Sequence, residues 1–193
     1  MKYISKLIAL TPKWDIARKL VSEFNIGNDY NSSKQYMISF CLIVKNEEVN
    51  IRRCLDSLIQ IKNKEIIIVD TGSTDRTIDI AREYNVRLYE YNWTNNFAAA
   101  RNESIKYAEG DWIFILDADE ELAPNSCETL NEDINRQNII GYRLPLENLS
   151  SPLSGVNYVP RLFRNSPGLY FIGKIHETIY ASLLVVGGQW NME

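Results

Sequence analysis

Histidine and cysteine are scarce in this sequence. Its 193 residues include one histidine, His176, and three widely spaced cysteines without a C-x-x-C pair. Structural zinc sites and disulfide-bonded scaffolds are built from clusters of these two residue types. The composition therefore excludes both of these classes, and we expect three reduced thiols, with Cys41 buried in a strand.

An excess of basic residues and a long apolar run are also absent. Lys and Arg number 21 against 25 Asp and Glu, which gives a formal net charge of −4. A nucleic-acid-binding surface needs excess positive charge to neutralise phosphates, so we expect no nucleic-acid partner. The longest apolar runs have the length of strands, well below the roughly 18 residues of a membrane span. We expect a cytoplasmic protein whose membrane association is at most peripheral, on the inner face of the membrane.

The first 35 residues differ from the rest. Hydrophobic residues recur at roughly helical spacing over residues 3–23, interrupted by Pro12, and a polar stretch follows over residues 25–34. An amphipathic stripe of this kind more often packs on a core or a partner than in a membrane. We therefore predict a helical extension and linker over residues 1–35, followed by one domain over residues 36–193.

From residue 38 to residue 122 the sequence alternates between two patterns. Near-continuous apolar runs, typical of strands covered on both faces, alternate with segments whose apolar residues have helical spacing. This alternation predicts an α/β fold in which a mainly parallel sheet is flanked by helices. The predicted strands span residues 38–44, 65–70, 86–91 and 111–116, and the predicted helices span residues 47–59, 76–84 and 97–108. The first helix has acids in its first turn, where the helix dipole favours them.

After residue 122 the pattern becomes irregular. Residues 124–138 fit one polar helix, and segments 139–146, 158–164 and 169–172 resemble strands separated by connections rich in Ser, Pro and Gly. We predict a nucleotide-binding half over residues 36–122 and a more β-rich half over residues 123–193.

Polar residues follow three of the predicted strands. The first strand ends in Lys45-Asn46-Glu47-Glu48, the second is followed by a turn that begins at Asp70, and the fourth ends in Asp117-Ala118-Asp119. Ligands of open parallel sheets bind at the carboxyl ends of the strands. Two carboxylates one residue apart favour a cation between them, and hard oxygen ligands suit Mg²⁺ or Mn²⁺. The alternative is that these acids only cap the next helix.

Four segments together carry a family resemblance. They read ISFCLIVKNEE, EIIIVDTGSTDRT, FAAARN and GDWIFILDADEE, in that order. In order and spacing they resemble the family 2 inverting glycosyltransferases of the GT-A fold. The later segments RLFR and GKIHE resemble the branch with lipopolysaccharide-core glucosyltransferases and bacteriocin peptide S-glycosyltransferases. The resemblance covers roughly residues 38–179 and implies transfer of glucose or a related hexose from a UDP-sugar, with Mg²⁺ or Mn²⁺, to an acceptor glycan, lipid-linked sugar or peptide.

The resemblance implies a nucleotide-sugar site in the first half of the domain. By position in the motifs, its residues are Val44, Asn46, Glu47, Asp70, Thr71, Ser73, Arg101, Asn102, Asp117 and Ala118. Thr71 stands where the commonest pattern has a second acid, and a hydroxyl brings no charge to the base. For Arg101, the alternative is an ion pair with a surface acid. Arg161 and Arg164 are further candidates, but their spacing in a strand lets only one of them face the diphosphate.

The resemblance also implies a metal site and a general base. Asp119 would be the main metal ligand, and Asp117 would also belong to the metal site but mainly contact the ribose or donor. His176 would join the metal or pyrophosphate unless it is a structural imidazole. An inverting transfer needs a base that deprotonates the acceptor opposite the leaving group. Glu177 is our first choice and Glu147 the second, while Glu120 and Glu121 remain candidates.

Two classes of protein are alternatives to a sugar transferase. A dinucleotide-dependent oxidoreductase needs G-x-G-x-x-G after the first strand, where Lys45-Asn46-Glu47 has no glycine, so this class is excluded. The alternative that stays open is a glycosyltransferase-like domain that binds a nucleotide sugar or a protein partner without turnover. The sequence ends at Glu193, soon after GKIHE, so a compact, a truncated or an excerpted domain all fit it.

Overall fold

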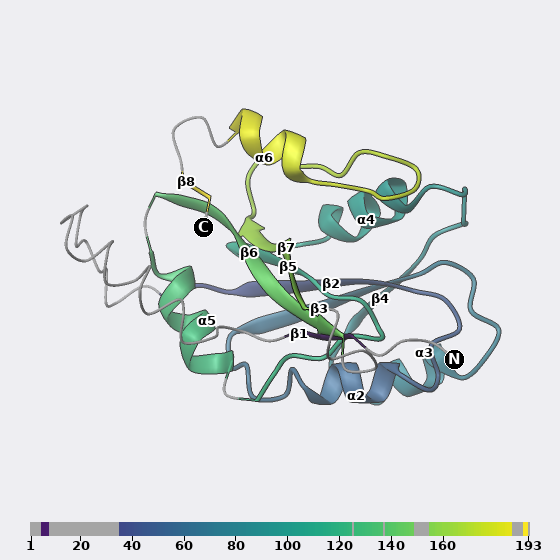
Figure 1. The fold of residues 1–193 in the computed structure, drawn as a ribbon. Helices are drawn as coiled ribbons and strands as arrows, with labels where there is room; N and C mark the ends of the chain where they lie inside the picture. The colour runs from purple at the N-terminus through teal and green to yellow at the C-terminus, as the bar shows by residue number, and fades with distance from the viewer. Residues whose placement is uncertain are drawn as a thin grey trace.

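The computed structural model of this protein describes residues 5–7, 35–124, 126–136, 138–148, 155–186 and 191–192. These residues form an eight-stranded mixed sheet with the strand order β1-β6-β7-β5-β2-β3-β4, and β8 pairs with β6 (Figure 1). The strands are β1 (Ser5–Leu7), β2 (Ile38–Val44), β3 (Lys64–Asp70), β4 (Arg87–Glu90), β5 (Trp112–Ile115), β6 (Ile139–Asn148), β7 (Val156–Arg164) and β8 (Asn191–Met192). The helices are α2 (Ile51–Asp56), α3 (Thr77–Ala81), α4 (Phe97–Lys106), α5 (Ser126–Ile134) and α6 (Tyr180–Val186).

The sheet has a parallel half and a largely antiparallel half. β2 pairs in parallel with β3 and β5, and β4 pairs in parallel with β3. β7 then joins β5 antiparallel, β6 joins β7 antiparallel, and β1 joins β6 antiparallel. The predicted fold class, a mixed sheet with a parallel nucleotide-type half, is confirmed.

Helices cover both faces of the sheet (Figure 1). α2, α3 and α5 lie on one face, where Phe40 and Leu42 pack in the larger hydrophobic cluster, and α4 and α6 lie on the other. Cys41, between those two residues, points into the second cluster with Ile113 and Leu183. Because successive side chains of a strand point to opposite faces, the apolar run of β2 supplies both cores. The prediction that Cys41 is buried in a strand is confirmed.

The first predicted helix starts later than its pattern indicated. α2 begins at Ile51 and has no acid in its first turn, so the prediction that Glu47 and Glu48 occupy that turn is wrong. Both residues instead contact the start of α3: the Glu47 backbone N–H donates to Thr77 Oγ1 at 2.6 Å, and Glu48 Oε2 accepts from the Arg76 N–H at 3.0 Å. These contacts join the segment before α2 to the start of α3.

Two further predictions of secondary structure fail. Residues 169–172 do not form a strand; only Ile172 makes an isolated bridge, to Thr178. The reason is that the Asn102 side chain satisfies the Phe171 backbone, donating to its carbonyl at 2.9 Å and accepting from its N–H at 2.7 Å. In the predicted N-terminal helix, Ser5–Leu7 is instead strand β1, and the rest of residues 3–23 and the stretch 25–34 lie outside the described residues.

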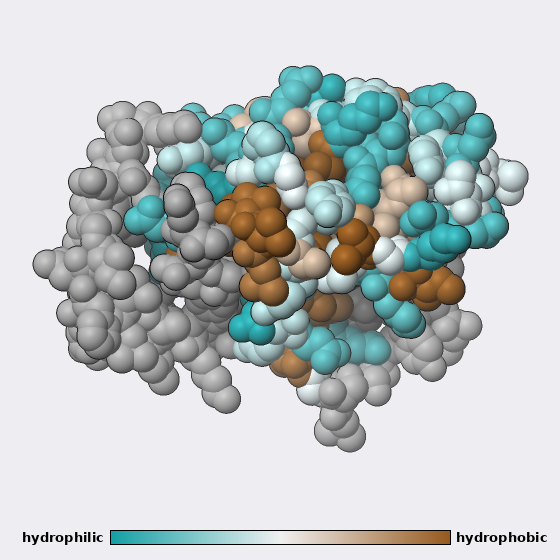
Figure 2. Space-filling model, turned by 90° about the horizontal axis from the view of Figure 1, so that it is seen from above, coloured by the Kyte–Doolittle hydropathy of each residue, from teal (hydrophilic) through white to brown (hydrophobic). Residues whose placement is uncertain are grey.

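No helix among the described residues is long and apolar enough to cross a membrane. Seen from the side of α4 and α6, the surface is largely hydrophilic, with separate hydrophobic areas (Figure 2). Large hydrophobic side chains are exposed on α6 and on the segment before it, at Tyr170, Ile172, Ile175, Tyr180, Leu184 and Val185.

Gly110 allows β5 to start close against β2. A Cβ atom at this position would lie 2.6 Å from Ser39 Oγ and 2.8 Å from the Met37 carbonyl oxygen. We expect Gly110→Ala to lower the free energy of unfolding by about 1–3 kcal/mol, because a packed backbone must move to admit the methyl group. Urea unfolding of the variant and of the wild type checks this. A Gly110→Ala midpoint equal to that of the wild type would contradict the close approach.

Candidate active site

A cavity of about 470 Å³ opens at the carboxyl ends of β2, β3 and β5. The residues that line it are Ile43, Val44, Lys45, Glu47, Thr71, Trp93, Phe97, Arg101, Asp117, Ala118, Asp119 and Glu177. The structure thus brings together eight of the predicted site residues, from Val44 to Glu177. Parallel strands place their carboxyl ends at one edge, and for that reason residues far apart in sequence meet here.

Asn46 and Ser73 shape the loops around the cavity and are not part of its lining. The Asn46 N–H donates to Ser73 Oγ at 2.9 Å, and Asn46 Oδ1 accepts from the Thr74 N–H at 2.8 Å. Asn46 has a φ of 55°, a left-handed conformation that asparagine adopts more readily than most residues. These bonds fix the loop after β2 to the loop after β3.

Asp70 and Thr71 also form contacts within the protein. The Asp70 carboxylate accepts from the N–H groups of Gly72 and Ser73, at 3.2 and 3.1 Å, and so closes the turn after β3. The Thr71 hydroxyl donates to the Val44 carbonyl at 3.0 Å, while the residue still lines the cavity. Asp70 does not line the cavity, so the structure gives it the role of holding the turn.

Asp117 lies between two arginines. Arg101 Nη2 hydrogen bonds to Asp117 Oδ1, and Arg161 Nη2 donates to Oδ2 at 2.9 Å. Burial alone would raise the pKa of Asp117, but the two guanidinium groups hold it well below its usual range. Asp117 is therefore a carboxylate whose charge the protein itself compensates.

Arg101 connects Asp117 to Glu177. Its side chain is 5% exposed, and its Nε lies 3.3 Å from Glu177 Oε1. Arg101 sits on α4, four residues after Phe97, so both side chains point to the same side of the helix and into the cavity. Its ion pairs are made with acids of the cavity, not with a surface acid.

Glu120 forms an ion pair with Arg161 and lies outside the cavity lining. Its Oε1 accepts from Arg161 Nη2 at 2.7 Å and its Oε2 accepts from the Asp117 N–H at 3.1 Å. Burial raises the pKa of Glu120 to about 7, although the Arg161 guanidinium acts in the opposite direction. Glu120 does not line the cavity, and the structure makes it a support for Arg161 instead of a group that meets a substrate.

A register shift in the sheet directs Arg161 toward this cluster. Tyr142 pairs with Leu162 while Arg143 pairs with Pro160, so Arg161 is an extra residue in β7. Bulges of this kind occur next to active sites, where they reorient a side chain.

Arg164 points to the face of the sheet opposite to that of Arg161, as the spacing of the two arginines predicted, and it does not line the cavity. It donates to the carbonyl oxygens of Arg136 at 2.6 Å and Ile139 at 3.2 Å. Its guanidinium lies 4.2 Å from the centre of the Trp112 ring. Arg164 thus closes the connection from α5 to β6.

Asn102 and Glu147 also lie away from the cavity. Asn102 was expected to face the nucleotide, but its amide is used on the Phe171 backbone. Glu147 lies on β6, opposite Lys6 of β1 and Val156 of β7, and does not line the cavity. His176 is exposed beside Glu177, with a φ of 57°, and is not part of the lining either.

The described residues offer few side chains that could bind a metal ion. Among the described residues, no group of three or more His, Cys, Asp and Glu side chains could hold a metal ion. Asp117 uses both carboxylate oxygens on arginines, while Asp119 lines the cavity. Mg²⁺ is usually bound by one or two carboxylates together with substrate phosphates and water, and Asp119 fits that kind of site.

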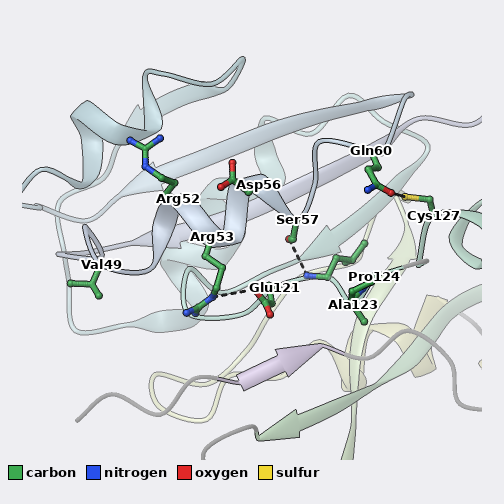
Figure 3. Close-up of a pocket in the computed structure, with 11 residues that line it drawn as sticks. Val49, Arg52, Arg53, Asp56, Ser57, Gln60, Glu121, Ala123, Pro124 and Cys127 are labelled. Carbon is green, nitrogen blue, oxygen red and sulfur yellow. Dashed lines mark hydrogen bonds and ion pairs between the residues drawn. The ribbon is translucent and has the colours of Figure 1, made fainter.

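A second cavity, of about 520 Å³, lies between α2 and the segment from Glu121 to Cys127 (Figure 3). On its wall Arg53 points toward Glu121, with 3.2 Å between Nε and Oε2, and Arg53 Nη2 donates to the Asp119 carbonyl at 3.3 Å. Ser57 Oγ accepts from the Leu122 N–H at 3.0 Å. α2 therefore supports the backbone of the loop that carries Asp119. No pattern in the sequence indicates these contacts.

The family model described as "Glycosyl transferase family 2" matches residues 39–169. The chain belongs to glycosyl transferase family 2. The predicted family is confirmed, and the GT-A fold is confirmed by the structural neighbours described below.

Several curated proteins resemble this family 2 domain. It is 37% identical to a TPR repeat-containing protein of Synechococcus elongatus over 79% of this chain and 38% of that protein. It is 31% identical to the glycosyltransferase SunS of Bacillus subtilis over 77% of this chain and 36% of SunS. It is 30% identical to the lipopolysaccharide core biosynthesis glycosyltransferase LpsC of Rhizobium meliloti over 74% of this chain and 56% of LpsC. The chain thus spans well under two thirds of each relative.

Solved glycosyltransferases share the fold of the family 2 domain. Staphylococcus aureus TarS 1–349 superposes with a TM-score of 0.53 at 17% identity, over 80% of this chain and 55% of that one. TarS in complex with UDP gives 0.51 at 22% identity, over 55% and 34%. The mannosyltransferase PcManGT of Pyrobaculum calidifontis, in complex with GDP-Man and Mn²⁺, gives 0.51 at 22% identity, over 67% and 41%.

The different surroundings of Arg161 and Arg164 lead to a prediction. We expect Arg164→Met to lower the free energy of unfolding by about 1–3 kcal/mol, because two backbone carbonyls lose a charged donor. The affinity for UDP should not change, since Arg164 lies on the face of the sheet opposite Asp117. Urea unfolding and calorimetric titration measure the two quantities. A large loss of UDP affinity in a folded Arg164→Met variant would return this residue to the donor site.

Proposed function

We propose that this domain transfers a hexose, glucose or a related sugar, from a UDP-sugar to an acceptor with inversion and with a divalent metal. The observation that carries the proposal is the cavity in which Asp119 lies beside Asp117, whose own charge is already compensated by Arg101 and Arg161. Asp119 places a second carboxylate on the wall of the cavity, where it would bind a divalent cation that also holds a diphosphate.

The donor would extend across the cavity from Thr71 and Glu47 toward Asp119. Asp119 would hold Mg²⁺ or Mn²⁺ together with the diphosphate, and His176 would reach the same group from the mouth of the cavity. The metal would neutralise the charge that grows on the departing nucleoside diphosphate. TarS in complex with UDP and PcManGT in complex with GDP-Man and Mn²⁺ support this arrangement by their similar folds.

Glu177 is the proposed general base. It lines the cavity, and its side chain is 18% exposed. Arg101 engages Oε1, so that Oε2 would accept the proton of the acceptor hydroxyl while the sugar is attacked from the face opposite the leaving group. Glu147 remains the second choice, although it lies outside the cavity lining. If the acceptor is a thiol, a strong base matters less, because thiols ionise near pH 8.5.

The remaining assignments follow from this function. Residues 36–122 would bind the nucleotide sugar, and residues 123–193 would contribute the acceptor side, with a glycan, a lipid-linked sugar or a peptide as acceptor. The domain would work in the cytoplasm or on the inner face of the membrane. The alternative is a domain that binds the nucleotide sugar or a protein partner without turnover.

Removal of the Asp119 charge tests the metal site. We expect Asp119→Asn to abolish the increase in UDP affinity that Mn²⁺ gives the wild type, and to abolish turnover of UDP-glucose, because an amide is a much weaker ligand for a hard cation. Calorimetric titration with UDP, with and without Mn²⁺, measures the first effect. Asp79→Asn is the control, since Asp79 is exposed on α3 and pairs with Arg82. Wild-type affinity in Asp119→Asn would refute the metal assignment.

The imidazole of His176 can be removed without straining its left-handed backbone. His176→Asn suits the φ of 57°, which asparagine tolerates better than alanine does. We expect this variant to bind Mn²⁺–UDP more weakly than the wild type, with an unchanged unfolding midpoint. Equal titration curves for the two proteins would make His176 a structural residue of the loop.

A further inference from the structure

Two aromatic rings form one corner of the cavity. Trp93 and Phe97 both line it, with ring centres 4.8 Å apart and ring planes at 72°. Phe97 is 41% exposed although it is a large hydrophobic side chain. Among the described residues, these are the only aromatic side chains in the cavity lining. The corner therefore presents flat apolar surface to whatever the cavity binds.

The backbone fixes this corner at several points. Trp93 Nε1 donates to Asn95 Oδ1 at 3.0 Å, and Asn95 has a φ of 56°. Asn96 caps α4 by accepting from the Ala99 N–H at 3.1 Å. The Phe97 N–H donates to the Lys174 carbonyl at 3.0 Å. A platform held in this way loses little conformational entropy when it binds a ligand.

The corner lies at the end of the cavity that is farther along the sheet from Asp119. The Tyr91 N–H donates to the Asp70 carbonyl at 2.8 Å, so the chain leaves β4 beside the end of β3 and reaches Trp93 two residues later. Asp119 follows β5, which is separated from β3 by β2. A ligand with its diphosphate at Asp119 would thus extend toward Thr71 and the aromatic corner at its other end.

The strand ends beside the corner offer no ring of their own. Ile43, Val44 and Thr71, at the ends of β2 and β3, also line the cavity, and the Thr71 hydroxyl already donates to the Val44 carbonyl. Aliphatic side chains give a nucleobase contact but not stacking. A flat heterocycle at this end would find its stacking partner in Trp93 or Phe97.

We propose that Trp93 and Phe97 bind the nucleobase of the donor. One of the two rings would stack on the face of the base, and the other would contact the edge of the base. The inference rests on the proposed function, because it assumes a nucleoside diphosphate in this cavity. Stacking tolerates different bases, since every base has a π face. Trp93 and Phe97 would therefore contribute to affinity for the nucleotide, while Asp119 acts on its diphosphate.

The test compares a ligand that has a base with one that lacks it. Wild type, Trp93→Leu and Phe97→Leu are titrated in Mn²⁺ with UDP, UDP-glucose and inorganic pyrophosphate. We expect the Kd for UDP to rise about tenfold in each variant, as for loss of one base–aromatic stack, and the Kd for pyrophosphate to stay unchanged. Tyr170→Leu, which removes an exposed ring outside the cavity, is the control.

Fluorescence gives a second readout of the same contact. UDP should quench the emission of the wild type to saturation, pyrophosphate should not, and Trp93→Leu should lose the UDP response. The unfolding midpoint of each variant is measured alongside, so that a loss of fold is recognised. Phe97→Leu tests the corner separately if Trp93→Leu does not fold.

Several outcomes would overturn the inference. Equal losses for UDP and pyrophosphate would mean that the rings only shape the cavity, and a loss for UDP-glucose but not for UDP would place them against the sugar. Unchanged UDP binding in both variants would also overturn it. A wild type that binds neither UDP nor pyrophosphate would refute the proposed function itself, and the inference with it.

Discussion

The ion pairs of Asp117 hold the site together. The carboxylate follows β5, its first partner Arg101 comes from α4, and its second partner Arg161 comes from β7. One acidic side chain thus joins the parallel half of the sheet, a helix on its face and the antiparallel half. A partly buried carboxylate without these cations would be costly, so the charges of the three elements stabilise the structure only as a set. Glu120 extends the set by holding Arg161 from the other side.

Much of the fold is predictable because its signals are local. The apolar runs of β2, β3 and β5 identify buried strands, and the polar residues after them identify the edge where a ligand binds. This reasoning predicts Asp117 and Asp119 as site residues, whereas Arg101 is predicted only by the family resemblance, and all three line one cavity. The antiparallel strands of the second half were found from similar runs, at β6 and β7.

The incorrect predictions share one feature: in each case a side chain forms hydrogen bonds with backbone groups of a segment that is distant in sequence. Asn102 satisfies the Phe171 backbone, so an apolar segment that resembled a strand does not need a neighbouring strand. Glu48 bonds to the Arg76 N–H and stays out of α2. Arg164 donates to the Arg136 carbonyl, after the end of α5, and to the Ile139 carbonyl at the start of β6. Such contacts depend on the folded arrangement of distant segments, and no periodicity in the sequence records them.

The bulge at Arg161 divides β7 into two parts with different constraints. Residues 162–164 are paired with β5, so Leu162 and Phe163 must keep their faces in the two cores. Residues 156–160 are paired with β6 alone. The length of the hairpin beyond Pro160 can therefore vary in a homologue without moving the guanidinium. A single insertion between Arg161 and Leu162 would instead turn a core residue toward the wrong face of the sheet. The position of the Arg161 side chain in the site therefore depends on the number of residues at this point of β7.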